Sequence, residues 1–168
     1  MTGSYLLLGS NLGKRILNIE KAKELLSDNS MRIQRESKIY ESEPWGVKDQ
    51  PWFLNQAIEI DFTGTPEDLL EVIKSIEQKI GRVKKRKWGE RLIDIDILYL
   101  NNQILNTPDL VIPHPEIQNR NFALKPLLEL SPRFIHPVLF KTQEQLQAEC
   151  TDKLICNVYL KSNPNVVD

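Results

Sequence analysis

Two aspartates separated by one residue lie in an otherwise apolar segment, LIDIDILYL (residues 92–100). Side chains alternate along a strand, so Asp94 and Asp96 leave the same face, with attachment points about 6.5 to 7 Å apart. Carboxylate ligands without a histidine cluster suit magnesium, which completes its shell with water and substrate phosphate. The pair therefore predicts a magnesium site, although the solvated acidic face of a strand produces the same pattern.

A basic segment immediately precedes this strand. The run RVKKRKWGER (residues 82–91) holds six basic residues and one acid, whereas the whole chain has a formal net charge of −1. A focused cationic loop on a mildly acidic body indicates a localised polyanion such as a phosphate chain. Neither a GxxxxGK[ST] run nor a GxGxxG run is present, so side chains must hold the phosphates. A solvated basic surface is the alternative.

Aromatic and amide side chains offer a site for a flat molecule. Phe53 and Asn55 share one face of a predicted strand, which places a ring beside an amide that donates and accepts hydrogen bonds. Phe122 is a candidate for the second face of such a ligand, but ordinary exposed aromatics explain both rings equally well. His114, between two prolines, is a candidate either for a phosphate contact or for structuring its turn.

Alternating and helical patterns predict the elements that carry these residues. Residues 5–8 read as a strand, after which Ser10 or Asn11 is expected to cap a helix extending to Leu26. Residues 31–41 are predicted to form a second strand, residues 43–51 a mobile loop, and residues 53–62 a third strand.

The clearest predicted helix follows. Thr65 is a good N-cap with Pro66 at the first helical position and Asp68 three residues on, and the apolar stripe ends at Gly81. In the strand over residues 92–100, Ile97 and Tyr99 are expected on the same side. The resulting order, β-α-β-β-α-β, predicts an α+β fold of the ferredoxin-like type, with additional C-terminal helices over residues 122–129 and 142–150.

Composition favours one globular domain over residues 1–168. No apolar run reaches the roughly 20 residues that span a bilayer, and the first residues lack a secretory signal, so we expect a cytoplasmic protein. Cys150 and Cys156 are too few for a disulfide framework or a zinc site. The net charge argues against binding nucleic acid or acidic membranes. A monomer is expected, with a homo-oligomer left open.

Four motifs together resemble a known family: GSNLG (9–13), DQPWFLN (49–55), KWGERLIDIDIL (87–98) and IPHPEIQNRNFALKPL (112–127). They are similar to those of 6-hydroxymethyl-7,8-dihydropterin pyrophosphokinase of folate biosynthesis. The resemblance runs from about residue 5 to residue 130. It implies transfer of pyrophosphate from ATP to the pterin hydroxymethyl group, giving AMP and the pterin diphosphate, with two magnesium ions.

The resemblance also implies residue roles. Asp94 and Asp96 match the metal ligands, and Arg82 and Arg91 are the expected stabilisers of the transition state. The implied pterin-binding residues are Ser42, Pro44, Trp45, Phe53, Asn55, Asp94 and Phe122. The implied ATP-binding residues are Glu77, Arg82, Lys84, Lys87, Trp88, Arg91, Ile97, His114 and Arg120. The basic loop departs from the family pattern, since Lys84 and Lys87 stand where arginines occur.

Two other functions fit parts of the sequence. A ferredoxin-like sheet with exposed aromatics is typical of modules that stack nucleic-acid bases, although the net charge and the absence of the RNP pattern speak against one. A two-metal phosphohydrolase would also use the aspartate pair, and it would release phosphate from ATP without a pterin. The loops at residues 43–51 and 82–90 are expected to order over the ligands of the favoured enzyme.

Overall fold

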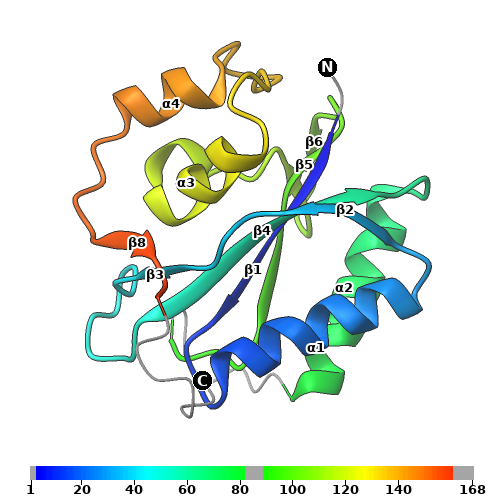
Figure 1. Cartoon of the computed structure of the whole chain (residues 1–168). Helices are drawn as coiled ribbons and strands as arrows, with labels where there is room; N and C mark the ends of the chain where they lie inside the picture. The colour runs from blue at the N-terminus through cyan, green and yellow to red at the C-terminus, as the bar shows by residue number, and fades with distance from the viewer. Residues whose placement is uncertain (1–2, 82–88, 161–168) are drawn as a thin grey trace.

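The fold is built on an antiparallel sheet covered by helices on both faces (Figure 1). The structure, a computed structural model, describes residues 3–81 and 89–160. The strands are β1 (Ser4–Ser10), β2 (Arg32–Glu36), β3 (Tyr40–Ser42), β4 (Phe53–Asp61), β5 (Asp94–Leu100), β6 (Leu105–Asn106), β7 (Val111–Ile112) and β8 (Cys156–Val158). The helices are α1 (Arg15–Asp28), α2 (Pro66–Ile80), the short 3-10 helix η1 (Ile117–Asn119), α3 (Asn121–Leu130) and α4 (Gln143–Glu149).

The main sheet runs in the order β5-β1-β4-β3-β8, and β2 also pairs with β4. β6 and β7 form a separate two-stranded ribbon. The expected combination of helices with an antiparallel sheet is therefore confirmed. Among the described residues, no helix is both long and apolar enough to cross a bilayer.

Two apolar clusters hold the layers together. On one face, Leu6 and Ile58 of the sheet pack with residues of α1 and α2, among them Ile19 and Ile76. On the other face, sheet residues such as Leu7 pack under α3 and α4. Burial of these side chains supplies the main driving force for assembling the three layers.

Helix α2 has the predicted ends. The hydroxyl of Thr65 accepts a hydrogen bond from the backbone N–H of Asp68, and the Asp68 carboxylate accepts one from the backbone N–H of Thr65. Gly81 closes the helix at a φ of 104°, a left-handed conformation that glycine adopts without strain. Local capping chemistry is sufficient here to fix both boundaries.

The predicted cap of α1 is wrong. The helix begins at Arg15 after Lys14, and neither Ser10 nor Asn11 caps it. The amide of Asn11 instead bonds Gln50, the Pro51 carbonyl and the backbone N–H of Arg91. A side chain so engaged with other loops is not available for the start of its own helix.

The single strand expected over residues 31–41 is interrupted. Residues 37–39 separate β2 from β3, and both strands pair with β4. Ser37 remains attached to β4, since its hydroxyl accepts from the Ala57 N–H at 3.0 Å and its own N–H donates to the Ala57 carbonyl at 2.9 Å. A side-chain hydrogen bond thus replaces part of the regular ladder.

The alternation expected in β5 is also wrong beyond Ile97. Leu6 of β1 pairs with Ile97, but the next residue back, Tyr5, pairs with Tyr99, so β5 holds one extra residue there. Such a β-bulge reverses the facing of the residues that follow it. Tyr99 consequently packs beside Tyr5 and Phe134 on the α3 face and not beside Ile97.

Candidate active site

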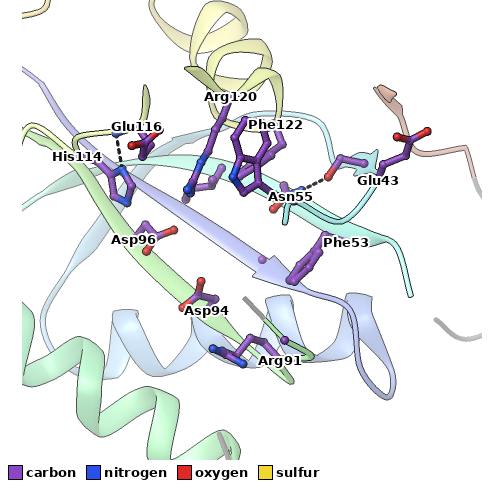
Figure 2. A pocket seen from close by; sticks show the side chains of 15 residues that line it. Glu43, Phe53, Asn55, Arg91, Asp94, Asp96, His114, Glu116, Arg120 and Phe122 are labelled. Carbon is purple, nitrogen blue, oxygen red and sulfur yellow. Dashed lines mark hydrogen bonds between the residues drawn. The ribbon is translucent and has the colours of Figure 1, made fainter. Parts of the chain in front are cut away.

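A cavity of about 740 Å³ opens where α3 leaves the end of the sheet uncovered. The sheet face that carries Tyr5 and Leu98 is packed under α3 and α4, whereas Gly9 and Asp94, farther along the same strands, face the cavity. The lining residues are Leu7, Gly9, Ser42, Glu43, Trp45, Phe53, Asn55, Gly89, Arg91, Asp94, Asp96, His114, Glu116, Arg120 and Phe122. Figure 2 shows these side chains converging from β4, β5 and the start of α3.

The two aspartates stand side by side on β5. Asp94 pairs with Gly9 and Asp96 with Leu7 of β1, and both carboxylates point into the cavity (Figure 2). Both side chains are half-buried. Among the described residues, no group of three or more His, Cys, Asp or Glu could hold a metal ion. A magnesium ion bound by two carboxylates fits this arrangement only if phosphate and water complete its shell.

An amide defines the polar floor beside the aspartates. Asn55 is buried and donates from Nδ2 to Ser42 Oγ at 2.9 Å, which fixes the orientation of the amide. A Cβ at Gly9 would lie 2.9 Å from Asn55 Oδ1, so a larger residue would displace the amide. The floor at this end therefore depends on a glycine in the neighbouring strand.

Aromatic rings form the walls of this end. Phe53 and Phe122 line the cavity from β4 and from the first turn of α3. Trp45 packs edge-to-face on Phe122 with ring centroids 6.5 Å apart. The Arg120 guanidinium carbon lies 5.1 Å from the Trp45 ring centroid and 5.6 Å from that of Phe122, within the range of cation–π attraction. Pro44, the neighbour of Trp45, is buried and does not line the cavity.

Two arginines bring positive charge to the acidic end. Arg91 is only 8% exposed, and its Nη1 donates to the Glu90 carbonyl at 3.0 Å. Burial lowers the pKa of Arg120, while the carboxylates of Glu116, Asp96 and Asp94 oppose this shift. The buried Nε of Arg120 has no hydrogen-bond partner within the described part of the chain. An anionic ligand would satisfy that donor and offset the desolvation.

His114 is held as a neutral ring. Its backbone N–H donates to the Leu98 carbonyl at 3.0 Å, and its Nδ1 accepts from the Glu116 N–H at 3.1 Å. Burial lowers its pKa to about 4, assisted by the positive charge of Arg120 and opposed by Asp94 and Glu116. Because Nδ1 accepts a hydrogen bond, the neutral ring carries its proton on Nε2. His114 can therefore donate one hydrogen bond to a ligand.

A smaller cavity of about 300 Å³ adjoins the first and shares Asp96 and His114 with it. Ile97 lies in its wall, with residues of the segment between β6 and β7. Glu77 lies outside both cavities. It is buried on α2 and accepts a hydrogen bond from the Ile95 backbone N–H at 3.1 Å. The predicted site residues Arg82, Lys84, Lys87 and Trp88 lie outside the described residues.

Three polar residues at or beside the site were not singled out from the sequence. Glu43 and Glu116 line the cavity, and Gln50 accepts a hydrogen bond from Asn11 at 2.9 Å. Gln50 lies in the quoted motif DQPWFLN, but no local pattern identifies a glutamine whose partner is 39 positions away. These contacts become visible only when the loops are placed in space.

Comparison with known proteins identifies relatives along nearly the whole chain. The family model described as 7,8-dihydro-6-hydroxymethylpterin-pyrophosphokinase (HPPK) matches residues 5–132. A protein of Aquifex aeolicus named 2-amino-4-hydroxy-6-hydroxymethyldihydropteridine pyrophosphokinase is 41% identical over 156 residues, covering 93% of this chain and 97% of that one. The Folic acid synthesis protein fol1 of Pneumocystis carinii is 43% identical over 134 residues, which is 80% of this chain but 18% of the relative.

Solved structures agree in fold. A crystal structure of Plasmodium falciparum HPPK-DHPS with pteroate superimposes with a TM-score of 0.71 at 18% identity, covering 88% of this chain. This chain spans only 42% of the length of that one. Fold, cavity and relatives together define a kinase that transfers a diphosphate group. The chain belongs to the HPPK family, which confirms the resemblance noted in its motifs.

Proposed function

We propose that this chain transfers a pyrophosphoryl group from ATP to 6-hydroxymethyl-7,8-dihydropterin, giving AMP and the pterin diphosphate in folate biosynthesis. The observation that carries the proposal is one cavity in which the Asp94 and Asp96 carboxylates adjoin an amide floor walled by aromatic rings. The acidic end suits a metal-bound polyphosphate, and the aromatic end suits a flat heterocycle. The names of relatives such as the Aquifex aeolicus protein support the same reaction.

The pterin is assigned to the aromatic end. Phe53 and Phe122 stack on its two faces, and the fixed amide of Asn55 forms hydrogen bonds with its polar edge. The remaining assigned contacts are Ser42, Pro44, Trp45 and Asp94. Pro44 is assigned a backbone contact on the family resemblance alone, because it does not line the cavity.

The nucleotide is assigned to the acidic end and the smaller cavity. His114 donates from Nε2 to a phosphate oxygen, and Arg91 and Arg120 offset phosphate charge. Ile97 contacts the nucleoside, and Glu77 supports that wall through the backbone of β5. Arg82, Lys84, Lys87 and Trp88 are assigned to ATP on the family resemblance alone.

The reaction requires positioning and charge neutralisation more than covalent chemistry by the protein. The pterin hydroxyl attacks the β-phosphorus in line and AMP leaves. Asp94 and Asp96 would hold two magnesium ions, which when bound supply neutralisation of phosphate charge. Arg91, with Arg82, stabilises the charge that builds up in the transition state. We assign no side chain as general base, and the hydroxyl proton passes to water.

The architecture supports a ferredoxin-like classification if β2 and β3 count as one interrupted strand, with α3, α4 and β8 as additions. We also propose that residues 1–168 form a single domain acting as a monomer in the cytoplasm. The partners assigned are the two small-molecule substrates, with neither nucleic acid nor membrane. Equilibrium sedimentation of the purified protein tests the monomer, and a dimer would contradict it.

An acceptor-omission assay tests the reaction. Purified protein is given magnesium and ATP with and without 6-hydroxymethyl-7,8-dihydropterin, and AMP is quantified. AMP that forms only with the pterin supports the proposal. Phosphate release in the absence of pterin would indicate the phosphohydrolase, and binding of single-stranded RNA without any turnover would indicate the nucleic-acid module.

A further inference from the structure

The segment after α4 connects the start of α3 to the outer edge of the sheet. In Figure 1 it descends from α4 to β8, which lies beside β3. We call residues 152–156 the strap. It follows the part of the chain that the family model matches, residues 5–132, and it contributes no lining residue to either cavity.

One end of the strap is fastened to the first turn of α3. The Asp152 carboxylate accepts from the Asn121 backbone N–H at 2.9 Å, and the Asn121 side chain donates to the Asp152 carbonyl at 2.9 Å. Arg120, the residue before the helix, provides no side-chain cap of its own. Asp152 thus supplies a cap and a negative charge at a helix start, from 31 positions away. The residues on either side of Asn121 are Arg120 and Phe122, both of which face the cavity.

The other end of the strap is fastened to the opposite wall. The Ile155 carbonyl accepts from the Glu43 backbone N–H at 3.0 Å, and Cys156 pairs with Ser42 across the β3–β8 ladder. Ser42 and Glu43 line the cavity, and Ser42 holds the Asn55 amide. A further bond, from Lys125 Nζ to the Cys156 carbonyl at 2.6 Å, connects α3 directly to the same point.

The strap itself is short and internally fixed. The second oxygen of the Asp152 carboxylate accepts from the Leu154 N–H at 3.0 Å, so one side chain both caps α3 and shapes the strap. Few rotatable bonds then separate the Asn121 anchor from the Glu43 anchor. The two walls are therefore connected through residues 152–155 and the hydrogen bonds at either end of this segment.

We propose that the strap sets the spacing between the two walls of the cavity, with Asp152 as a positioning residue for Arg120 and Phe122. The inference rests on the proposed function, which assigns Phe122 to the pterin and Arg120 to the phosphates. Asp152 touches no substrate, and its effect acts through α3 and β3.

The variants Asp152→Ala and Asp152→Asn test the proposal against two controls. Lys153→Ala changes an exposed neighbour in the strap. Thr65→Ala removes a comparable cap from α2, whose capped end lies outside both cavities. KM for pterin, KM for ATP and kcat are measured well below the unfolding temperature of each variant. We expect Asp152→Ala to raise KM for pterin about five- to tenfold. Asp152→Asn should raise it less, and in both controls KM for pterin should stay within about twofold of the parent value.

Amide hydrogen exchange gives a readout that does not depend on turnover. In Asp152→Ala, the Asn121 amide and the Glu43 amide should both exchange at least about fivefold faster, whereas neither changes in Thr65→Ala. Faster exchange at the Asn121 amide alone would overturn the proposal, because Asp152 would then act only as a local cap of α3. Equal values of KM for pterin in Asp152→Ala and Thr65→Ala would also overturn the proposed role of the strap. Absence of pterin-dependent AMP from the parent protein would instead overturn the proposed function, while the exchange result would still decide whether the strap couples the walls.

Discussion

Asn11 and Arg91 bond each other through their backbones and one side chain. The Arg91 N–H donates to Asn11 Oδ1 at 2.8 Å, and the Asn11 N–H donates to the Arg91 carbonyl at 3.0 Å. The same Asn11 amide donates to Gln50 and to the Pro51 carbonyl, each at 2.9 Å. Three segments that border the cavity therefore meet on one buried side chain.

This relationship predicts a loss of both stability and activity in Asn11→Ala. An unsatisfied buried N–H at Arg91 alone costs about 1–3 kcal/mol, and Arg91 is no longer held beside Asp94. We expect a lower midpoint in urea unfolding and a lower kcat at saturating substrates. Asn29→Ala is the matched control, because the Asn29 side chain donates to the Leu25 carbonyl at the end of α1. A normal kcat in a destabilised Asn11→Ala protein would show that Asn11 does not position Arg91.

Replacing either aspartate should lower turnover sharply without unfolding the protein. In Asp94→Asn and Asp96→Asn the side-chain volume is kept but a metal-binding charge is lost, and we expect kcat to fall by on the order of 100-fold or more. Asp61→Asn, at the exposed far end of β4, should retain activity. Kinetics over a magnesium titration provide the measurement. Unchanged magnesium dependence in both variants would contradict the metal assignment.

Gly9→Ala should act on the pterin end through Asn55. The new methyl group would lie 2.9 Å from Asn55 Oδ1, so the amide must move and its bond to Ser42 weakens. We expect KM for pterin to rise about tenfold, with KM for ATP little changed. Ser42→Ala removes the same hydrogen bond without crowding and should show a smaller rise. An increase confined to KM for ATP would place the pterin elsewhere.

The half-buried His114 predicts a specific pH dependence of stability. Burial lowers its pKa from 6.5 to about 4 in the folded state, so the unfolded chain takes up a proton at a higher pH than the folded protein. The free energy of unfolding should therefore fall as the pH falls from about 6.5 to about 4. His136, whose pKa is also lowered by burial, contributes in the same direction.

Urea unfolding of His114→Gln and His136→Gln across this pH range is the check. Each substitution should make the decline shallower, and only His114→Gln should also raise KM for ATP at neutral pH. A decline as steep in His114→Gln as in the parent would mean that the ring is not buried as a neutral group.

Sequence alone was enough for elements whose signals are local. Both ends of α2 follow from Thr65 and Gly81, whose capping roles depend only on neighbouring backbone. Thr142 caps helix α4 through the same kind of capping box. The aspartate pair on β5 could also be identified, because alternation over three residues is unaffected by the bulge farther along the strand.

Features that depend on distant partners could not be predicted. The bulge that turns Tyr99 toward α3 depends on how β5 pairs with β1, which periodicity within β5 does not contain. Asn11 looked like a helix cap because its partner Arg91 is 80 positions away. The cap of α3 is similarly hidden, since Asp152 lies in a segment without any recognisable motif.

The identity of the products is the most direct test of pyrophosphoryl transfer by this protein. Protein, magnesium, ATP and 6-hydroxymethyl-7,8-dihydropterin are incubated, and mass spectrometry identifies both the pterin product and the nucleotide. We expect pterin diphosphate and AMP in equal amounts from the parent protein, and neither product from Asp96→Ala. Pterin monophosphate with ADP, or unmodified pterin with free phosphate, would contradict it.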